Sequence, residues 1–244
     1  MTYRTLDAAA ILDTCERLSA RIEERFPESG LSNVARELVE LSRESRRRID
    51  DIRKPFWPVR IGAGIVLALI IAIAIGVGVS AQMPSTRIEL FSLLQIAEAA
   101  INDVIFLGIA TFFLLTIEAR LKRRKALRAL HQLRSIAHVI DMHQLTKDPE
   151  QLLSTDMTTS SSPDRGLSRF ELARYLDYCS EMLSIVSKIA ALYLQYLDDA
   201  LVLGAANDIQ NLTSGLSSKI WQKIMIVDGV IPSTRERATE TRSS

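Results

Sequence analysis

The stretch IGAGIVLALIIAIAIGVGVSA, residues 61–81, is a run of 21 consecutive positions without a charged side chain. A bilayer core about 30 Å thick is crossed by roughly 20 apolar residues in a helix. Eleven of the 21 residues are Ile, Leu or Val, and each of these favours insertion by about 0.3–0.6 kcal/mol. The run begins about 60 residues into the sequence and is longer than the core of a secretory signal. We therefore interpret it as a transmembrane helix.

The same run carries a small side chain at every fourth position. Residues four apart lie on one face of a helix. In lipid, small residues allow two helix backbones to approach closely, and this drives helix association. We therefore predict a homo-oligomer and a helix-packing groove formed by Gly64, Ala68, Ala72, Gly76 and Ser80.

A second uncharged run, Val104–Ile117, predicts a second membrane helix over about 99–119. Seven Lys and Arg residues lie at 43–60, seven at 120–134, and only one between Gln82 and Asn102. Basic residues stay on the cytoplasmic side. This distribution predicts a two-span hairpin in the plasma (inner) membrane, with both termini cytoplasmic. If the second run lay in the membrane surface instead, the two basic clusters would fall on opposite sides.

Four amphipathic helices are predicted on either side of this hairpin, at 6–25, 31–54, 170–197 and 200–226. The helix at 31–54 has the heptad spacing of a coiled coil. The two helices before the membrane form one αα-hairpin, and the two near the C-terminus form another. Because neither hairpin can bury its apolar face alone, we expect the two to form a four-helix bundle. Dimerisation is the rival way to cover the same surfaces.

The expected fold class is an all-α membrane protein: a two-span transmembrane helical hairpin with a cytoplasmic helical bundle built from the N- and C-terminal αα-hairpins. Its expected segments, in chain order, are an N-terminal cytoplasmic helical hairpin (1–56), transmembrane helix 1 (57–83), a short external loop, partly helical (84–98), transmembrane helix 2 (99–119), a basic cytoplasmic stalk helix (120–145), a Ser/Thr-rich linker (146–168), a C-terminal cytoplasmic helical hairpin (169–230) and a disordered tail (231–244).

The basic clusters beside the predicted spans are candidate contacts for anionic lipid headgroups. A Lys or Arg just cytoplasmic of a span gains about 1 kcal/mol from such lipids. Nucleic acid is not an expected partner, because the net charge is only +1 and no aromatic residues alternate with the basic ones. The predicted lipid contacts are Arg46, Arg47, Arg48, Lys122, Arg123, Arg124 and Lys125.

The three histidines, His131, His138 and His143, fall within 13 residues. His131 and His138 share a helix face, with Asp141 one turn further on, and such a set can bind a divalent metal. However, the pair lacks the i, i+4 spacing of helical metal sites, and Arg134 lies between them. We expect no bound metal, and pH sensing is the alternative role.

Catalytic motifs are lacking: the sequence contains no P-loop, no GxSxG, no HExxH and no Gly-rich dinucleotide turn. Cys15 and Cys179 are too far apart for a metal-type spacing. We expect no cofactor and no enzymatic activity. The sequence favours an integral membrane scaffold or signalling protein whose bundle binds a cytoplasmic protein partner. The alternative is a subunit of a small oligomeric channel or transporter, in which the small-residue groove packs copies around a pore.

Overall fold

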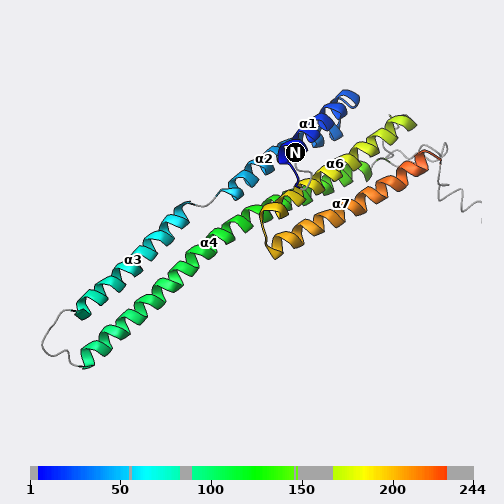
Figure 1. Ribbon diagram of the computed structural model, residues 1–244. Coiled ribbons are helices and arrows are strands. Elements are labelled where there is room, and N and C mark those ends of the chain that lie inside the picture. The colour runs from blue at the N-terminus through cyan, green and yellow to red at the C-terminus, as the bar shows by residue number, and fades with distance from the viewer. Residues whose placement is uncertain (1–4, 55–56, 83–89, 146, 148–166, 230–244) are drawn as a thin grey trace, which may run out of the picture. The chain divides into compact units, whose positions relative to one another are not determined.

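The structure is a computed structural model that describes residues 5–54, 57–82, 90–145, 147 and 167–229. Within these residues every regular element is a helix and none is a strand, which confirms the all-α class (Figure 1). The helices are α1 (Ala8–Arg25), α2 (Gly30–Arg53), α3 (Trp57–Gln82), α4 (Leu90–Leu145), α6 (Arg169–Tyr196) and α7 (Ala200–Val227).

The amphipathic helices α1, α2, α6 and α7 begin and end within two residues of the predicted bounds. The middle of the chain differs more. A single helix, α4, runs from Leu90 to Leu145 and includes part of the predicted external loop, the second predicted span and the predicted stalk. The rest of that loop, most of the predicted linker and the predicted tail lie outside the described residues.

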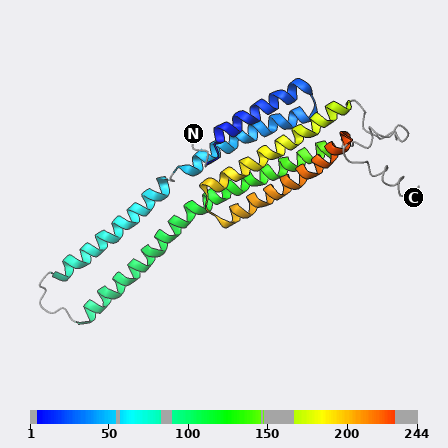
Figure 2. The same ribbon diagram turned by 45° about the vertical axis from the view of Figure 1, so that its right-hand side comes forward.

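The chain forms two compact units: residues 52–124, and residues 1–51 together with 125–244. In the first of these, α3 and the N-terminal part of α4 lie side by side and run in opposite directions (Figures 1 and 2). Both are long and apolar enough to cross a membrane, and almost none of their apolar stretch is buried. Ile65, Phe106 and Phe112 are 63%, 71% and 73% exposed.

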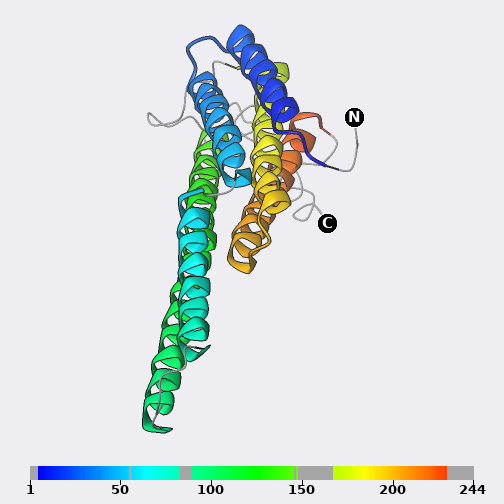
Figure 3. The same ribbon diagram turned by 60° about the vertical axis from the view of Figure 1, so that its left-hand side comes forward.

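The other unit is a helical bundle made of α1, α2, the C-terminal part of α4, α6 and α7 (Figure 3). Helix α6 packs against both α1 and α7. It is the most enclosed helix, with buried side chains around most of its circumference. Helix α7 is buried along a single stripe instead, at positions such as Val202, Ile209, Leu216 and Ile220.

Residues 125–145, which make up most of the predicted stalk, belong to the bundle unit. Six of their apolar side chains, which form one stripe, are 0–1% exposed, so α4 contributes a fifth helix to the predicted four. The sequence contained this stripe at helical spacing, and such a stripe needs cover from other helices. What the sequence did not show was which helices cover it. The buried residues are Ala126, Ala129, Leu130, Leu133, Ala137 and Ile140.

Side-chain caps fix where the C-terminal helices begin. Ser168 accepts a hydrogen bond from the backbone N–H of Glu171, and the Glu171 carboxylate accepts one from the N–H of Ser168. This reciprocal capping box satisfies two donors that a helix start leaves unpaired. The Asp199 carboxylate accepts from Leu201 and Val202 in the same way at the start of α7. Both starts are therefore set locally, by short-range sequence.

Candidate interaction surface

The predicted small-residue groove of α3 is not covered within its own unit. Gly64, Ala68, Ala72 and Gly76 are all exposed. A methyl group added at Gly64 or Gly76 would meet no atom within 4 Å among the described residues. The side chain of Ser80 lies outside the described part of the chain. The groove is thus an open face of α3, and its contact with a second helix stays a prediction.

The α2 basic cluster divides into two kinds of side chain. Arg46 and Arg47 are exposed, although Arg47 pairs with Glu40 at 3.2 Å. Arg48 is only half-exposed; it pairs with Glu44 at 2.7 Å and donates to Gln132 Oε1 of α4 at 2.5 Å. Arg48 therefore ties two bundle helices together, a role that differs from the lipid contact predicted for it.

The α4 basic cluster divides similarly. Lys122 forms an ion pair with Glu118 at 2.8 Å, and Arg123 is half-buried and also has an interaction. Arg124 and Lys125 are exposed. Of the predicted lipid contacts on α4, Arg124 and Lys125 therefore have the most exposed side chains.

The histidines do not come together. His131 and His138 are exposed on α4, whereas His143 lies against the first residue of α2. A Cβ atom added to Gly30 would come 2.5 Å from Cε1 of His143, so the glycine permits this close approach. Among the described residues, no group of three or more His, Cys, Asp or Glu side chains could hold a metal ion.

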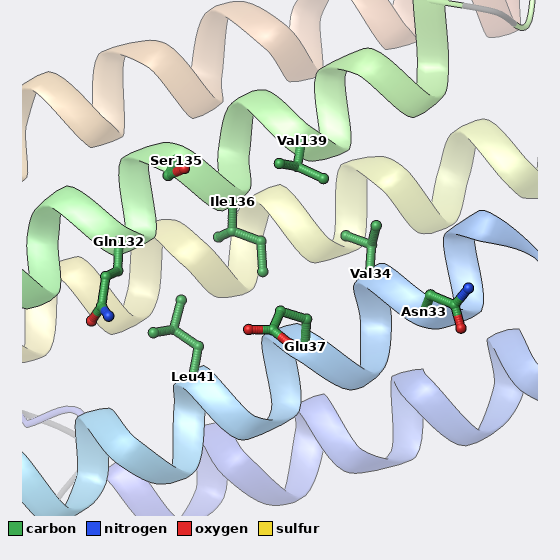
Figure 4. Close-up of a pocket in the computed structure, with 8 residues that line it drawn as sticks. All are labelled: Asn33, Val34, Glu37, Leu41, Gln132, Ser135, Ile136 and Val139. Carbon is green, nitrogen blue, oxygen red and sulfur yellow. The ribbon is translucent and has the colours of Figure 1, made fainter.

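An open groove of about 430 Å³ runs between α2 and α4, and the sequence analysis did not find it (Figure 4). Its floor is apolar: Val34 and Leu41 of α2 and Ile136 of α4 are buried. In Figure 4 Leu41 and Ile136 point toward each other across the groove. Exposed polar side chains form its mouth. The lining residues are Asn33, Val34, Glu37, Leu41, Gln132, Ser135, Ile136 and Val139.

The contacts along the groove show that α2 and α4 are antiparallel. Gly30, at the start of α2, lies against His143 near the end of α4. Arg48, near the end of α2, bonds to Gln132, which is further toward the N-terminus of α4. Residues whose numbers rise along α2 thus meet residues whose numbers fall along α4.

A buried polar contact joins α2 to α6. Burial raises the pKa of Tyr193, and the neighbouring Ser45 and Arg48 offset part of that effect. Neither the Tyr193 hydroxyl nor the Ser45 hydroxyl has a well-formed hydrogen bond among the described residues. Both side chains are at most 1% exposed. Burying a hydroxyl without a partner costs about 1–3 kcal/mol.

The two helices beside the groove carry different charges on their exposed faces. On α2, Glu37, Glu40 and Glu44 follow one another at spacings of three and four. Glu37 has no ion-pair partner among the described residues, whereas Glu40 and Glu44 pair with arginines of α2. On α4, no acidic residue occurs between Glu118 and Asp141.

The exposed α4 face continues this contrast. Arg128, His131, Ser135 and His138 are spaced three and four apart, so they share one helix face. All four are exposed, and none has a side-chain partner within the part of the chain that the structure describes. The groove therefore has an acidic edge on α2 and a basic edge on α4.

A second hollow, of about 500 Å³, is lined by several arginines, but their guanidinium groups interact with neighbouring side chains. Arg21 pairs with Glu181 at 2.8 Å, and Arg174 pairs with Asp177 at 2.8 Å. Both guanidinium groups also lie over the ring of Tyr178. These contacts are structural, and they leave little positive charge for an anion. The lining residues are Arg21, Glu24, Arg25, Arg174 and Tyr178.

The two thiols are buried and are poor nucleophiles. Burial raises the pKa of Cys15 to about 11, with a smaller opposing effect from a hydrogen bond to Ser42. Burial likewise raises the pKa of Cys179 to about 12. Reactive cysteines have a lowered pKa and partial exposure, so Cys15 and Cys179 behave as apolar core residues.

In comparisons with known proteins, the chain matches no protein-family model, no curated protein and no solved structure.

Proposed function

We propose that the protein is a non-enzymatic integral membrane scaffold or signalling protein. In this proposal α3 and the N-terminal part of α4 form a two-span hairpin in the plasma (inner) membrane, with both termini cytoplasmic. The bundle binds a partner on the cytoplasmic side.

The observation that carries this proposal is the exposure of the apolar helices. A helix this apolar in a soluble protein would lie in the core, but Ile65, Phe106 and Phe112 are each more than 60% exposed. Leaving apolar surface in water costs about 25 cal/mol per Å². A bilayer removes that cost and leaves the helical backbone groups hydrogen-bonded within each helix.

The charges beside the apolar helices support the orientation. Arg46 and Arg47 precede α3, and Arg124 and Lys125 follow the apolar part of α4; all four are exposed. Each contributes about 1 kcal/mol near an anionic membrane surface. With both clusters on the cytoplasmic side, the bundle lies there too, and anionic headgroups are its nearest lipid partners.

The topology is tested with single added cysteines in intact cells and a membrane-impermeant maleimide. The two native cysteines are buried, so they contribute little background. We expect Gln82→Cys to react in intact cells and Ser218→Cys, on the exposed side of α7, to react only after permeabilisation. Labelling of Ser218→Cys in intact cells, or release of the protein from membranes by an alkaline wash, would contradict the proposal.

The alternative of a small oligomeric channel or transporter subunit is favoured by one observation, the uncovered face at Gly64 and Gly76. Copies packed through this face could surround a pore. A pore built from two-span chains needs several copies, whereas a scaffold does not. The mass of the detergent-solubilised protein, together with ion flux into vesicles containing it, distinguishes the two.

A further inference from the structure

We infer that the groove between α2 and α4 binds the same groove of a second copy of this chain, across a two-fold axis that runs along it. This inference rests on the proposed function in one respect, because it treats the bundle as the part that binds a partner. The inference identifies the partner as a second copy of the same chain.

Val139 and Met142 supply most of the apolar contact area, because the floor residues are only 6–8% exposed. Val34, Leu41 and Ile136 form the floor, and Val139 at one end is 38% exposed. Beyond it on α4, Met142 is 67% exposed. An interface core of this kind is apolar, with a polar rim. The floor and its extension provide the core, and Asn33, Glu37, Gln132 and Ser135 provide the rim.

Charge complementarity selects the occupant. One edge of the groove carries Glu37, Glu40 and Glu44, and the other carries Arg128, His131 and His138. A two-fold axis along the groove exchanges left and right, so α2 of each copy faces α4 of the other. Every acidic edge then meets a basic edge, twice in the dimer.

The same charges exclude the other face-to-face two-fold arrangement. If the axis ran across the groove, α2 would face α2 and α4 would face α4. The acidic edge of α2 would then oppose the acidic edge of the second copy, and the basic edge of α4 would oppose the second basic edge, which is unfavourable. Only the axis along the groove places unlike charges together.

The antiparallel register within the chain gives the pairs that should meet between chains. In Figure 4, Leu41 and Gln132 lie toward one end of the groove, and Val34 and Val139 lie toward the other. About one helical turn beyond Leu41 and Gln132, three residues further along α2 and four residues back along α4, Glu44 is level with Arg128. Glu37 is level with Ser135 by the same register. Across the two-fold axis, Glu44 therefore meets Arg128 of the second copy, and Glu37 meets its Ser135.

A helix from a different protein is the rival occupant. It would need an apolar stripe for the floor, a basic flank for α2 and an acidic flank for α4. The second copy already supplies both flanks at the correct spacing. We therefore commit to the second copy and treat a foreign helix as an outcome of the test.

The test cross-links two differently tagged full-length chains, co-expressed in membranes. One chain carries Glu37→Cys and the other Ser135→Cys, so any bridge between the added thiols joins two chains. The native thiols are buried and do not compete. We expect a mixed-tag adduct with a short thiol-specific reagent. The matched control replaces Ser135→Cys with Asn211→Cys, which is exposed on α7 and should give at least tenfold less adduct.

Charge reversal provides the second arm. Arg128 has no partner in its own chain among the described residues, so Arg128→Glu disturbs no internal ion pair. We expect this variant to weaken the dimer about tenfold, equivalent to about 1.4 kcal/mol. A mixture of Arg128→Glu chains with Glu44→Arg chains should recover the dimer, because each mutated edge then faces its opposite charge. Asp208→Arg, an exposed charge on α7, should have no effect.

Several results would overturn the inference. In the cross-linking arm, these are equal yields of adduct with Ser135→Cys and Asn211→Cys, or an adduct that forms only with a different protein. In the charge-reversal arm, they are a dimer that Arg128→Glu leaves unchanged, or a mixture of the two variants in which the dimer does not recover. Membrane fractionation of the same samples keeps the two proposals apart. A protein that stays in the membrane without the adduct refutes the second-copy contact alone. A soluble protein that gives the adduct refutes the membrane assignment alone.

Discussion

Replacing Leu133 with alanine tests the place of α4 in the bundle. Leu133 is 0% exposed and lies in the part of α4 that the sequence suggested was a stalk. In a stalk this side chain would face solvent, and its truncation would change the free energy of unfolding by less than about 0.5 kcal/mol. In a bundle core the same truncation removes buried methyl groups and leaves a cavity.

The expected magnitude follows from the burial. Leu→Ala substitutions at fully buried sites cost about 2–5 kcal/mol, and we take about 3 kcal/mol for Leu133. Since about 1.4 kcal/mol is a factor of ten, the population of opened bundle should rise about a hundredfold. The matched control is Met142→Ala on the same helix, where the side chain is 67% exposed. Its effect should be no more than about twofold.

The native thiol of Cys179 provides the assay. It is 0% exposed, and burial raises its pKa to about 12. At pH 8 a maleimide therefore reacts with it through opened molecules, and the labelling rate follows their population when closing is fast. The measurement uses the full chain in its membrane or detergent, and mass spectrometry separates Cys179 from Cys15. Equal labelling rates in Leu133→Ala and Met142→Ala would refute the assignment of α4 to the core.

Three further predictions concern other parts of the molecule. Ala72→Leu should block close helix approach and reduce the assembled species on native gels, whereas the neighbouring Ile71→Leu should be nearly neutral; equal losses would remove the basis for the α3 groove. Ser168→Ala should destabilise the bundle by about 1 kcal/mol, because it removes the N-cap of α6. Hydrogen bonds from Ser168 lower the pKa of the Glu171 carboxyl group. The ionised Glu171 should therefore contribute to stability above the carboxyl pKa of the unfolded chain, and this contribution should be lost as the pH falls through the lowered pKa. In Ser168→Ala that pH dependence should shrink, as denaturant titrations at several pH values would reveal. Elemental analysis should find no stoichiometric metal, and about one zinc or iron per chain, lost in His138→Ala, would show that the reading of the histidines was wrong.

The sequence was sufficient for what depends on near neighbours. The ends of α1, α2, α6 and α7 were predicted within two residues, since proline, glycine and capping side chains act locally. Asp199, which lies between the two predicted C-terminal helices, is the N-cap of α7. The all-helical class followed from spacing alone, because a period near 3.6 residues recurs throughout.

What the sequence did not contain is the identity of neighbours distant along the chain. The apolar stripe through Leu130, Leu133 and Ala137 was visible, but it can be covered by any apolar face. Its continuity with the second predicted span suggested a stalk. The groove depends on α2 lying beside α4, and these helices meet through residues far apart in the sequence, such as Arg48 and Gln132, which are 84 positions apart and hydrogen-bonded. Periodicity along one helix carries no information about that pairing.

The unsatisfied hydroxyls of Tyr193 and Ser45 bear on how this bundle selects a single arrangement. Helices lined with leucine, isoleucine and alanine can slide past one another by a turn and still bury similar apolar area. In such a slipped state the two hydroxyls would also lose the neighbouring polar groups, such as Arg48, that offset part of the effect of burial in the native arrangement. The cost would then approach the full penalty of about 1–3 kcal/mol for each hydroxyl placed against hydrocarbon. The Tyr193–Ser45 contact thus adds little to the stability of the native arrangement, but it raises the free energy of the slipped arrangements. The bundle exchanges some stability for uniqueness, as buried polar residues do when they fix the register of coiled coils.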